Sequence, residues 1–349
     1  MFHELTVRDV RAETPDAVAV SFDVPDGLKD AFRFEPGQYL TLRHDVDGAD
    51  LRRSYSIASL PVDPLTVGIK QVENGAFSTF AQTLTKGDCV KVMSPQGRFL
   101  WTGETRIVLI AAGSGVTPMI AIAGAALAAG AEVTLVLGNR SIDTIMFRDT
   151  LNALKDRHIG RFTLIHVLSR EPQDVDILNG RVSGDRVLKL ANAGAVNLGS
   201  ADGVFLCGPG GMIDDVSDAL RKMGVAEDKI HFERFTQGDE APRMPKSQAA
   251  TEAADEGVAI DVMLDGRTRS FGFDSTDDSI VDAAARQGLE LPFSCKGGMC
   301  CTCRCKVTEG SAEMAVNYSL EPWELQAGFT LACQARPTSR RLTLDFDAA

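Results

Sequence analysis

The chain has 349 residues, of which 44% are hydrophobic and 24% are charged. This length exceeds what one hydrophobic core supports, so it predicts two or three domains of ordinary globular composition. The net charge of −12 argues against nucleic acid or an anionic membrane as a partner.

The first 103 residues are predicted to form an antiparallel β-barrel domain. Residues 1–8 carry neither the basic region nor the apolar core of a signal peptide. Short runs with strand character are separated by Pro, Gly and Asp turns, as in small barrels. These runs are 17–24, 38–43, 52–58, 65–72 and 89–93. We expect Cys89, in the last run, to be buried as a small hydrophobic residue.

The third run contains Arg53-Ser-Tyr55-Ser56, whose side chains suit a flat, phosphorylated ligand. An Arg can clamp a phosphate, an aromatic side chain can stack on a ring, and a hydroxyl can bond a ring nitrogen. By itself the motif indicates little, because most such tetrapeptides are merely exposed strand.

Residues 104–235 are predicted to form an α/β domain with a parallel sheet. Continuous apolar runs, typical of strands buried on both faces, alternate with helix-compatible segments. These runs are 107–112, 132–137, 162–168 and 203–207. The uncharged stretch 116–131 is too short and too rich in alanine to span a membrane, so a buried helix is expected there.

Two glycine-rich loops follow strands of this domain. The first, Gly113-Ser-Gly115-Val-Thr117-Pro, would let a pyrophosphate approach backbone N–H groups at a helix start. The second, Cys207-Gly208-Pro-Gly-Gly-Met, lies at the strand end where ligands of open α/β sheets collect. Each loop alone is a weak signal, since a tight turn also explains it.

Residues 236–257 are polar and rich in alanine and proline, with almost no large apolar side chain, and are predicted to be a linker. Residues 258–349 form the last predicted domain. We expect strands at 258–264 and 269–273 and a helix at 279–287.

Four cysteines carry the sharpest signal of the chain. Cys295, Cys300 and Cys303 stand in C-x4-C-x2-C spacing, and Cys333 follows thirty residues later. This is the ligand spacing of a plant-type [2Fe–2S] cluster. Zinc sites favour two C-x2-C pairs, and Cys333 has no paired partner. Structural disulfides are the other alternative, but nothing indicates secretion, and free thiolates point to a reducing cytoplasm.

The order of these motifs resembles the ferredoxin–NADP reductase superfamily fused to a plant-type ferredoxin. R-x-Y-S, G-x-G-x-T-P, C-G-P-G-G-M and the cysteine set follow one another over all of the chain but the linker. The segments 231–235 and 317–337 resemble the reductase subunits of bacterial phenylacetyl-CoA epoxidases. The implied fold is a flavin β-barrel, an α/β parallel-sheet nucleotide domain and an α+β ferredoxin domain of β-grasp type.

The resemblance implies a flavin site that holds FAD rather than FMN. Arg53 would hold the flavin phosphate, Tyr55 would flank the isoalloxazine ring, and Ser56 would lie near its N5. Glu233 and Phe235 would lie beside the flavin, with Phe235 in place of the family's ring-covering aromatic. Further contacts to the flavin phosphates would come from Lys70, Gly75, Ser78 and Thr79.

The same resemblance places the nicotinamide nucleotide on the glycine-rich loops. Gly113, Gly115 and Thr117 would receive the nucleotide, and Cys207 with Gly208 would line the nicotinamide. The residues beside the reacting rings, predicted as the catalytic group, are Ser56, Cys207 and Glu233.

Three further residues bear on the choice of nucleotide. Arg140, Ser169 and Arg170 resemble positions that grip the 2′-phosphate in NADPH-using members. A basic side chain suits a phosphate monoester, so NADPH is expected over NADH.

The implied function is the transfer of electrons from NADPH through FAD and a [2Fe–2S] cluster to a multicomponent oxygenase. The expected partner is a di-iron epoxidase or monooxygenase component, with phenylacetyl-CoA 1,2-epoxidase first. Two alternatives remain open: an FMN-containing NADH reductase of a Rieske dioxygenase, of the phthalate dioxygenase reductase type, and a non-enzymatic iron–sulfur carrier. The intact R-x-Y-S and G-x-G-x-T-P motifs argue against the carrier.

Overall fold

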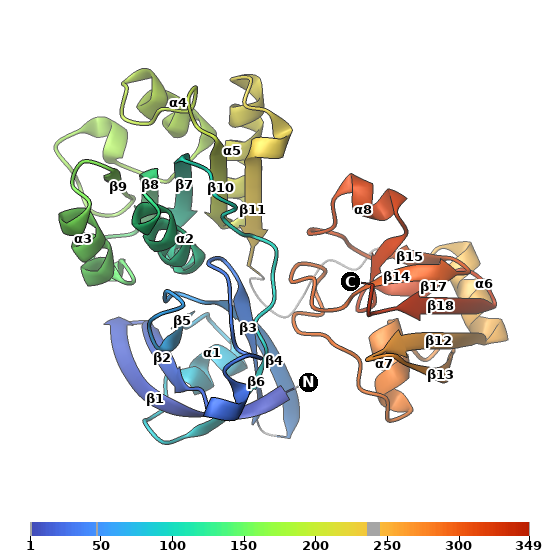
Figure 1. Ribbon diagram of the computed structural model, residues 1–349. Coiled ribbons are helices and arrows are strands. Elements are labelled where there is room, and N and C mark those ends of the chain that lie inside the picture. The colour runs from blue at the N-terminus through green and yellow to red at the C-terminus, as the bar shows by residue number, and fades with distance from the viewer. Residues whose placement is uncertain (1, 47, 236–244, 349) are drawn as a thin grey trace. The chain divides into compact units, whose positions relative to one another are not determined.

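The computed structural model describes residues 2–46, 48–235 and 245–348. Contacts divide the chain into two compact units, Met1–Phe235 and Thr236–Ala349 (Figure 1). Within the described ranges, no helix has both the length and the apolar character that crossing a membrane requires.

The first part of the first unit is a six-stranded antiparallel sheet in the order β4-β3-β6-β1-β2-β5. A bridge between Ile57 and Val67 connects the chain just after β4 to β5, at the opposite end of this order. The inward-facing residues and the short helix α1 (Ala76–Ala81) share one apolar core. The strands are β1 (Phe2–Thr14), β2 (Ala17–Asp23), β3 (Tyr39–Val46), β4 (Ala49–Ser56), β5 (Leu65–Lys70) and β6 (Cys89–Met93).

All five runs predicted in this region contain strands, whereas the sequence does not predict β1. Most side chains of β1 are polar, and only Leu5 and Val7 are completely buried along its middle. The expected burial of Cys89 is wrong, because Cys89 is exposed. It begins β6, where the alternate residues Val90 and Val92 point into the core instead.

The second part of the first unit is a parallel sheet in the order β11-β10-β7-β8-β9. The chain runs outward from β7 to β9 and then returns to the other side of β7, so the strand order reverses between β7 and β10. Ligands of open α/β sheets bind at such a reversal. The strands are β7 (Arg106–Ala112), β8 (Glu132–Asn139), β9 (Phe162–Leu168), β10 (Gly203–Gly208) and β11 (Ile230–Arg234).

Helices cover both faces of the parallel sheet (Figure 1). Alternate residues of β7 divide between the two cores: Leu109 packs with α2 and α3, while Ile110 packs with α4 and α5. Nearly every residue of α2 is buried, which confirms the buried helix predicted for the uncharged stretch. The helices are α2 (Val116–Ala128), α3 (Arg148–Arg157), α4 (Gly184–Asn192) and α5 (Gly210–Lys222).

The second unit has a mixed five-stranded sheet in the order β13-β12-β18-β14-β16, in which only the β12–β18 pair is parallel. A two-stranded sheet pairs β15 with β17. The strands are β12 (Val258–Leu264), β13 (Arg267–Phe273), β14 (Arg304–Glu309), β15 (Ala312–Met314), β16 (Phe329–Leu331), β17 (Ala335–Pro337) and β18 (Arg341–Asp345). The helices are α6 (Gln248–Glu256), α7 (Ile280–Arg286) and α8 (Pro322–Gln326).

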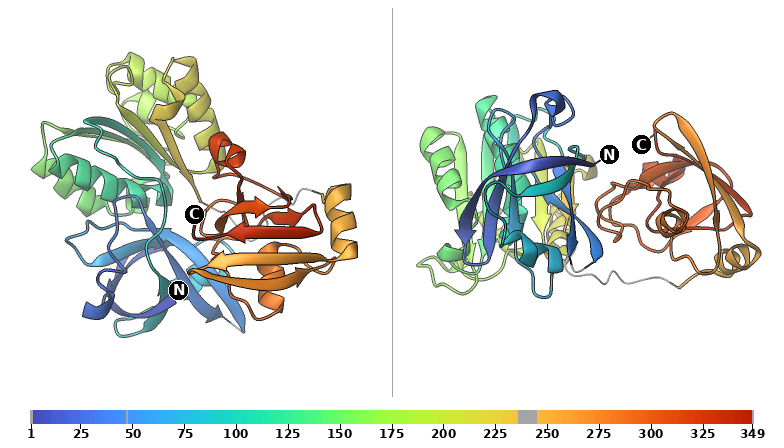
Figure 2. Two further views of the ribbon diagram at one scale, coloured as in Figure 1. Left: turned by 45° about the vertical axis from the view of Figure 1, so that its right-hand side comes forward. Right: turned by 90° about the horizontal axis from the view of Figure 1, so that it is seen from below.

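Helix α6 corrects the linker predicted at residues 236–257. Ala250, Ala253 and Ala254 are buried, and the helix packs on the second unit (Figure 2). Ser247 caps the helix by accepting a hydrogen bond from the amide of Ala250. Alanines spaced three and four residues apart form one narrow face that packs closely without large side chains. Residues 236–244 of the predicted linker lie outside the described residues.

Candidate functional site

The three residues predicted as the catalytic group lie together in the first unit. Ser56 ends β4, and its Oγ donates a hydrogen bond of 2.9 Å to Oε2 of Glu233 on β11. Glu233 is the register partner of Cys207 in the parallel β10–β11 pair. Two residues beyond Glu233, Phe235 is partly buried against the core that includes α2 and α3.

Burial determines the protonation of this group. It raises the pKa of Glu233 to about 7, while the hydrogen bond from Ser56 acts in the opposite direction. Burial, reinforced by the charge of Glu233, raises the pKa of Cys207 well above its usual value, so the thiol stays protonated. Glu233 therefore gains and loses a proton near neutral pH, and Ser56 is in hydrogen-bond contact with it.

The first glycine-rich loop packs directly against the end of β10. A Cβ at Gly115 would lie 2.1 Å from the carbonyl oxygen of Cys207, so no side chain fits there. Gly113 has a φ of +56°, which favours glycine. A Cβ at Gly208 would lie 3.2 Å from the amide nitrogen of Ala112. The two loops therefore present bare backbone at Gly113, Gly115 and Gly208, at the point where the strand order reverses.

Thr117 connects the two parts of the first unit. Its hydroxyl donates a hydrogen bond of 2.9 Å to the carbonyl oxygen of Ser114, within the same loop. Its side chain is buried, and a Cβ at Gly68 on β5 would lie 2.6 Å from Thr117 Cγ2. The hydroxyl of Thr117 thus stabilises the loop itself, and the methyl group packs on the β-rich part.

Arg53 and Tyr55 stand two residues apart on β4, and side chains at this spacing share one face of a strand. Tyr55 is partly buried, 5.8 Å from the ring of Phe77, and burial raises the pKa of its hydroxyl. Arg53 donates a hydrogen bond of 2.9 Å from Nη1 to the carbonyl oxygen of Arg52.

The remaining residues predicted for the flavin phosphates lie between the end of β5 and the middle of α1: Lys70 ends β5, Gly75 precedes α1, and Ser78 and Thr79 are in α1. Ser78 Oγ accepts a hydrogen bond from the amide of Val72 and donates one to the carbonyl oxygen of Gly75. Thr79 Oγ1 accepts a hydrogen bond of 3.2 Å from the side chain of Gln71. The two hydroxyls therefore hold the turn in shape.

The three residues predicted for the 2′-phosphate also come together, where β8 and β9 end. The amide of Ser169 donates to the carbonyl oxygen of Asn139, and the amide of Arg170 donates to that of Arg140. Nδ2 of Asn139 is buried and has no hydrogen-bond partner among the described residues. Arg140 forms an ion pair of 2.8 Å with Asp16, a contact that the sequence does not predict.

In the second unit the four predicted ligands form two pairs. Hydrogen bonds connect Cys295 with Cys300 and Cys303 with Cys333. Over residues 2–46, 48–235 and 245–348, no three His, Cys, Asp or Glu side chains gather as a single-metal site requires. A two-iron cluster instead takes two thiolates on each iron, so the pairs fit that group better than zinc. All eight cysteines are free thiols, which gives no support to structural disulfides.

Local backbone geometry builds the cysteine loop. Gly298 has a φ of +73°, and a Cβ there would lie 2.9 Å from the carbonyl oxygen of Val316. The amide of Gly297 points at the sulfur of Cys295, 3.3 Å away. Backbone donors aimed at sulfur suit an iron–sulfur cluster, whose potential depends on such hydrogen bonds. The donor set and the turn therefore fit a [2Fe–2S] group.

Pairing of β14 with β16 brings the distant fourth cysteine to the loop. The amide of Ala332 donates a hydrogen bond of 2.9 Å to the carbonyl oxygen of Cys303, and Cys333 follows directly. Two other cysteines have different surroundings: Cys301 donates to the hydroxyl of Ser319, and Cys305 is fully buried in the core.

Sequence reasoning misses a buried ion pair beside the cluster loop. Arg304, between Cys303 and Cys305, lies 2.7 Å from the carboxylate of Glu324 on α8, and Glu324 is completely buried. The guanidinium also lies over the ring of Phe329 at 3.5 Å. The partners are twenty residues apart, so no local pattern connects them.

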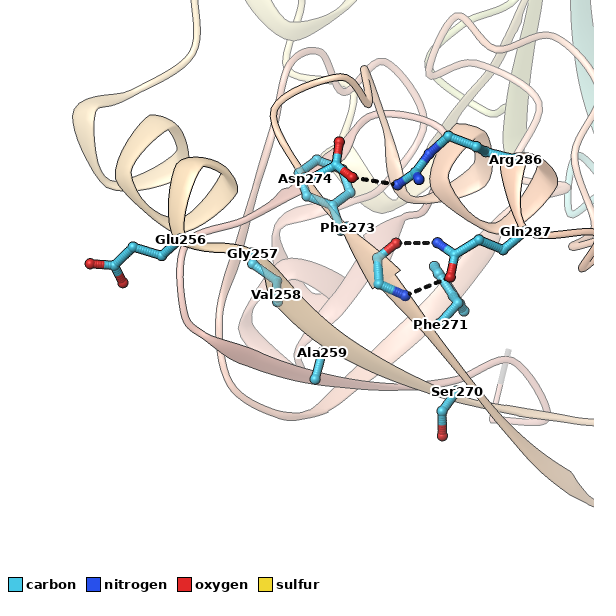
Figure 3. A pocket seen from close by; sticks show the side chains of 11 residues that line it. Glu256, Gly257, Val258, Ala259, Ser270, Phe271, Phe273, Asp274, Arg286 and Gln287 are labelled. Atoms are coloured by element: carbon cyan, nitrogen blue, oxygen red, sulfur yellow. Dashed lines mark hydrogen bonds and ion pairs between the residues drawn. The ribbon is translucent and has the colours of Figure 1, made fainter.

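One pocket of the second unit lies along the edge strand β13 and contains none of the predicted site residues. Figure 3 shows that the side-chain amide of Gln287 pairs with both backbone groups of Gly272, and that Arg286 pairs with Asp274. These contacts satisfy an exposed strand edge. The pocket is therefore separate from the groups described above.

Three family models match successive parts of the chain. They are an oxidoreductase FAD-binding domain over residues 4–101, an oxidoreductase NAD-binding domain over 109–218, and a 2Fe-2S iron-sulfur cluster binding domain over 262–338. Their order matches the two parts of the first unit followed by the second unit.

Relatives of similar length extend this match over the whole chain. One of the subunits of 1,2-phenylacetyl-CoA epoxidase from Escherichia coli K12 is 43% identical, over 99% of this chain and 98% of that protein. The ferredoxin reductase component of 3-ketosteroid-9-alpha-monooxygenase from Rhodococcus rhodochrous is 33% identical, over 98% and 96%. The solved structure of phthalate dioxygenase reductase shares the fold, with a TM-score of 0.60 at 21% identity over 99% of this chain and 98% of that one. The chain is thus an oxidoreductase and belongs to the ferredoxin–NADP reductase superfamily, in the branch that carries a fused C-terminal plant-type [2Fe–2S] ferredoxin domain.

Proposed function

We propose that this chain is the reductase of a phenylacetyl-CoA 1,2-epoxidase system and passes electrons from NADPH through FAD and a [2Fe–2S] cluster to the oxygenase component. The observation that carries this proposal is the 43% identity to the Escherichia coli epoxidase protein, which spans nearly the full length of both chains. The FAD-binding, NAD-binding and iron–sulfur parts that such a relay needs follow one another along the chain.

In the first unit, the chain's own residues bind cofactors and handle one proton. Arg53 and Lys70 supply positive charge for the flavin phosphates, and Tyr55 flanks the ring. FAD, when bound, supplies the conversion between two-electron and one-electron transfer. Glu233 takes up and releases a proton near neutral pH while accepting a hydrogen bond from Ser56 Oγ, and the protonated thiol of Cys207 adds no charge beside the nicotinamide.

The nucleotide site is formed mainly by backbone. Gly113, Gly115 and Gly208 leave room for the nucleotide to approach the chain, and Thr117 keeps the loop in shape. Phe235 covers one side of the flavin site. Ser169, Arg170 and Arg140 meet the 2′-phosphate. The side-chain amide of Asn139, which has no partner among the described residues, supports a polar ligand at the same strand end.

In the second unit, Cys295 and Cys300 would hold one iron of the cluster, and Cys303 and Cys333 would hold the other. The cluster, when bound, supplies one-electron transfer. The two-by-two arrangement of the thiols supports this assignment. The buried Arg304–Glu324 pair fixes the loop that carries Cys303.

The domain limits follow the same proposal. Residues 1–103 form the flavin domain as a closed β-barrel, and residues 104–235 form the nucleotide domain. The ferredoxin domain is of β-grasp type; helix α6 extends it before residue 258, to Gln248.

The partner we propose is a di-iron oxygenase component in the cytoplasm. The 33% identity to a reductase component of 3-ketosteroid-9-alpha-monooxygenase supports a second candidate partner, the oxygenase of a system of that kind. The two candidates differ only in the acceptor, since the path of electrons inside this chain is the same for both.

Reconstituted turnover tests the proposal. The purified chain is combined with NADPH, phenylacetyl-CoA and the oxygenase component of the epoxidase, and epoxide formation is measured. We expect turnover that depends on both proteins and is faster with NADPH than with NADH. Turnover with a 3-ketosteroid monooxygenase alone, or reduction of neither oxygenase, contradicts the proposed partner.

A further inference from the structure

The ion pair of Arg140 belongs to a small charged cluster at the junction of the two parts of the first unit. Asp16 lies in the turn between β1 and β2, and its Oδ2 is 2.8 Å from Nη2 of Arg140 and 3.5 Å from Nζ of Lys70. The other carboxylate oxygen accepts a hydrogen bond of 2.8 Å from the hydroxyl of Thr14. One carboxylate therefore serves two cations, one from each part of the unit.

The backbone holds this carboxylate in place. The carbonyl oxygen of Asp16 accepts a hydrogen bond of 2.7 Å from the amide of Gln71, directly after β5. The next residue, Ala17, pairs in register with Lys70. Asp16 is thus fixed by strand pairing, and its side chain reaches the end of β8 from a defined position.

The charge of Asp16 persists at neutral pH. Burial raises the pKa of the carboxyl, but the hydrogen bond from Thr14 and the charges of Lys70 and Arg140 together hold it below its usual value. Two cations and one carboxylate leave a net charge of about +1 here instead of about +2. Among the described residues, the guanidinium of Arg140 has no other hydrogen-bond or ion-pair partner.

We propose that Asp16 is a specificity-determining residue that weakens the binding of the 2′-phosphate of NADPH by neutralising the guanidinium of Arg140. The inference rests on the 2′-phosphate site proposed above. A phosphate monoester carries up to two negative charges and would bind the guanidinium of Arg140. The carboxylate of Asp16 already pairs with this guanidinium, with 2.8 Å between Oδ2 and Nη2, so it competes with the phosphate. NADH has a neutral hydroxyl at that position, so its binding is almost insensitive to the carboxylate. Asp16 therefore lowers the ratio of kcat/KM for NADPH to kcat/KM for NADH.

The substitution that tests this is Asp16→Asn, which removes the charge and keeps an oxygen that can accept the hydrogen bond from Thr14. Ferricyanide reduction by the holoenzyme reports on the flavin without involving an oxygenase. We expect kcat/KM for NADPH to rise about fivefold, through KM, while kcat/KM for NADH stays within about twofold. The inhibition constant of 2′,5′-ADP should fall by a similar factor, and that of 5′-AMP should not.

Three further variants separate an effect on nucleotide specificity from an effect on the fold. Asp9→Asn removes the same charge from an exposed position on β1 and should leave kcat/KM unchanged for both nucleotides. Combining Asp16→Asn with Arg140→Gln should abolish the gain for NADPH. Asp16→Ser also removes the carboxylate and must give the same shift in the ratio of NADPH to NADH.

Two results would overturn the inference. One is an unchanged ratio of kcat/KM for NADPH to kcat/KM for NADH, whether neither value changes or both change by the same factor. The other is a rise in KM for NADPH, which would make Asp16 a residue that positions Arg140 for the phosphate. If the wild-type chain prefers NADH, the proposed choice of nucleotide fails by itself. Even then Asp16→Asn is expected to raise the ratio, so the two failures are distinguishable.

Discussion

The two units of this chain assemble their candidate sites in different ways. In the second unit, three of the four cysteines lie within nine residues, and one strand pair supplies the fourth. In the first unit, Ser56 and Glu233 are 177 residues apart and meet through the arrangement of two sheets. A metal cluster can be encoded in a loop, whereas a site for two flat cofactors needs surfaces from distant parts of the chain.

The largest effect we predict separates the two sites completely. Cys300→Ser removes one thiolate of the four and should lower electron delivery to the oxygenase at least a thousandfold, because no electron can leave the flavin through the cluster. NADPH–ferricyanide activity should stay within about twofold of wild type. The matched control is Cys89→Ser, which replaces an exposed cysteine of the first unit and should leave both activities intact. If Cys300→Ser still delivered electrons to the oxygenase, the cluster would not be the route by which electrons leave the flavin.

A second prediction concerns the stability of the cluster loop. Glu324→Gln leaves the buried guanidinium of Arg304 without its counter-ion and should cost the second unit about 3 kcal/mol of unfolding free energy. The control, Glu256→Gln, breaks the exposed pair with Arg340 and should cost less than about 1 kcal/mol. Chemical unfolding measures both losses. Cluster absorbance monitors the second unit, and flavin fluorescence monitors the first. Equal losses in the two variants would contradict the importance of the buried pair.

A third prediction sharpens the comparison within the first unit. Gly115→Ala places a Cβ 2.1 Å from the backbone of Cys207, and backbone cannot move aside cheaply. We expect a loss of about 2 kcal/mol in stability and weaker NADPH binding. Gly211→Ala on α5 is the control: its Cβ meets nothing within 4 Å, and it should gain up to about 1 kcal/mol from helix propensity. Apparent melting temperatures and KM for NADPH are measured for both variants. Equal values in Gly115→Ala and Gly211→Ala would contradict the prediction.

The smallest predicted effect is on pH dependence. Glu233→Gln should lower the rate of flavin reduction by NADPH about tenfold and remove the ionisation near pH 7 from its profile. The folded pKa of about 7 lies above the usual 4.5, so the fold binds the proton more tightly than the unfolded chain. The stability that this proton contributes is present below pH 4.5 and is lost as pH rises through 7. The stability of the Gln variant should not fall over this range, because Gln does not ionise. Stopped-flow traces and melting curves from pH 5 to 9 that match wild type would refute the role.

The contrast between the units also explains what the sequence could predict. Ligand spacing identifies Cys295, Cys300 and Cys303 because three sulfurs around one cluster demand a short loop. Strand β10, expected at residues 203–207 and found at Gly203–Gly208, is predicted to within one residue because it is buried along its whole length and carries no charged side chain. The family resemblance gave Ser56, Cys207 and Glu233. The parallel register brings Cys207 beside Glu233, and a hydrogen bond from β4 joins Ser56 to them.

The features that escaped prediction depend on tertiary contacts. Asp16 has no motif around it, and its role arises only when the β1–β2 turn meets the end of β8. Strand β1 has few apolar residues, and α6 has only alanines to bury, so composition alone predicted neither element. Side-chain size and periodicity identify elements that bury large apolar faces; they miss elements that pack by backbone proximity.

The account depends most on three redox partners, NADPH, FAD and a [2Fe–2S] cluster, acting in sequence within one chain. Anaerobic reduction of the purified holoprotein by NADPH, followed by visible and EPR spectroscopy, tests this directly. We predict bleaching of flavin absorbance and then the rhombic EPR signal of a reduced plant-type cluster, which is lost in Cys300→Ser while the flavin still bleaches. Flavin that bleaches without any iron signal in the wild-type protein, or the absence of both signals, would contradict the account.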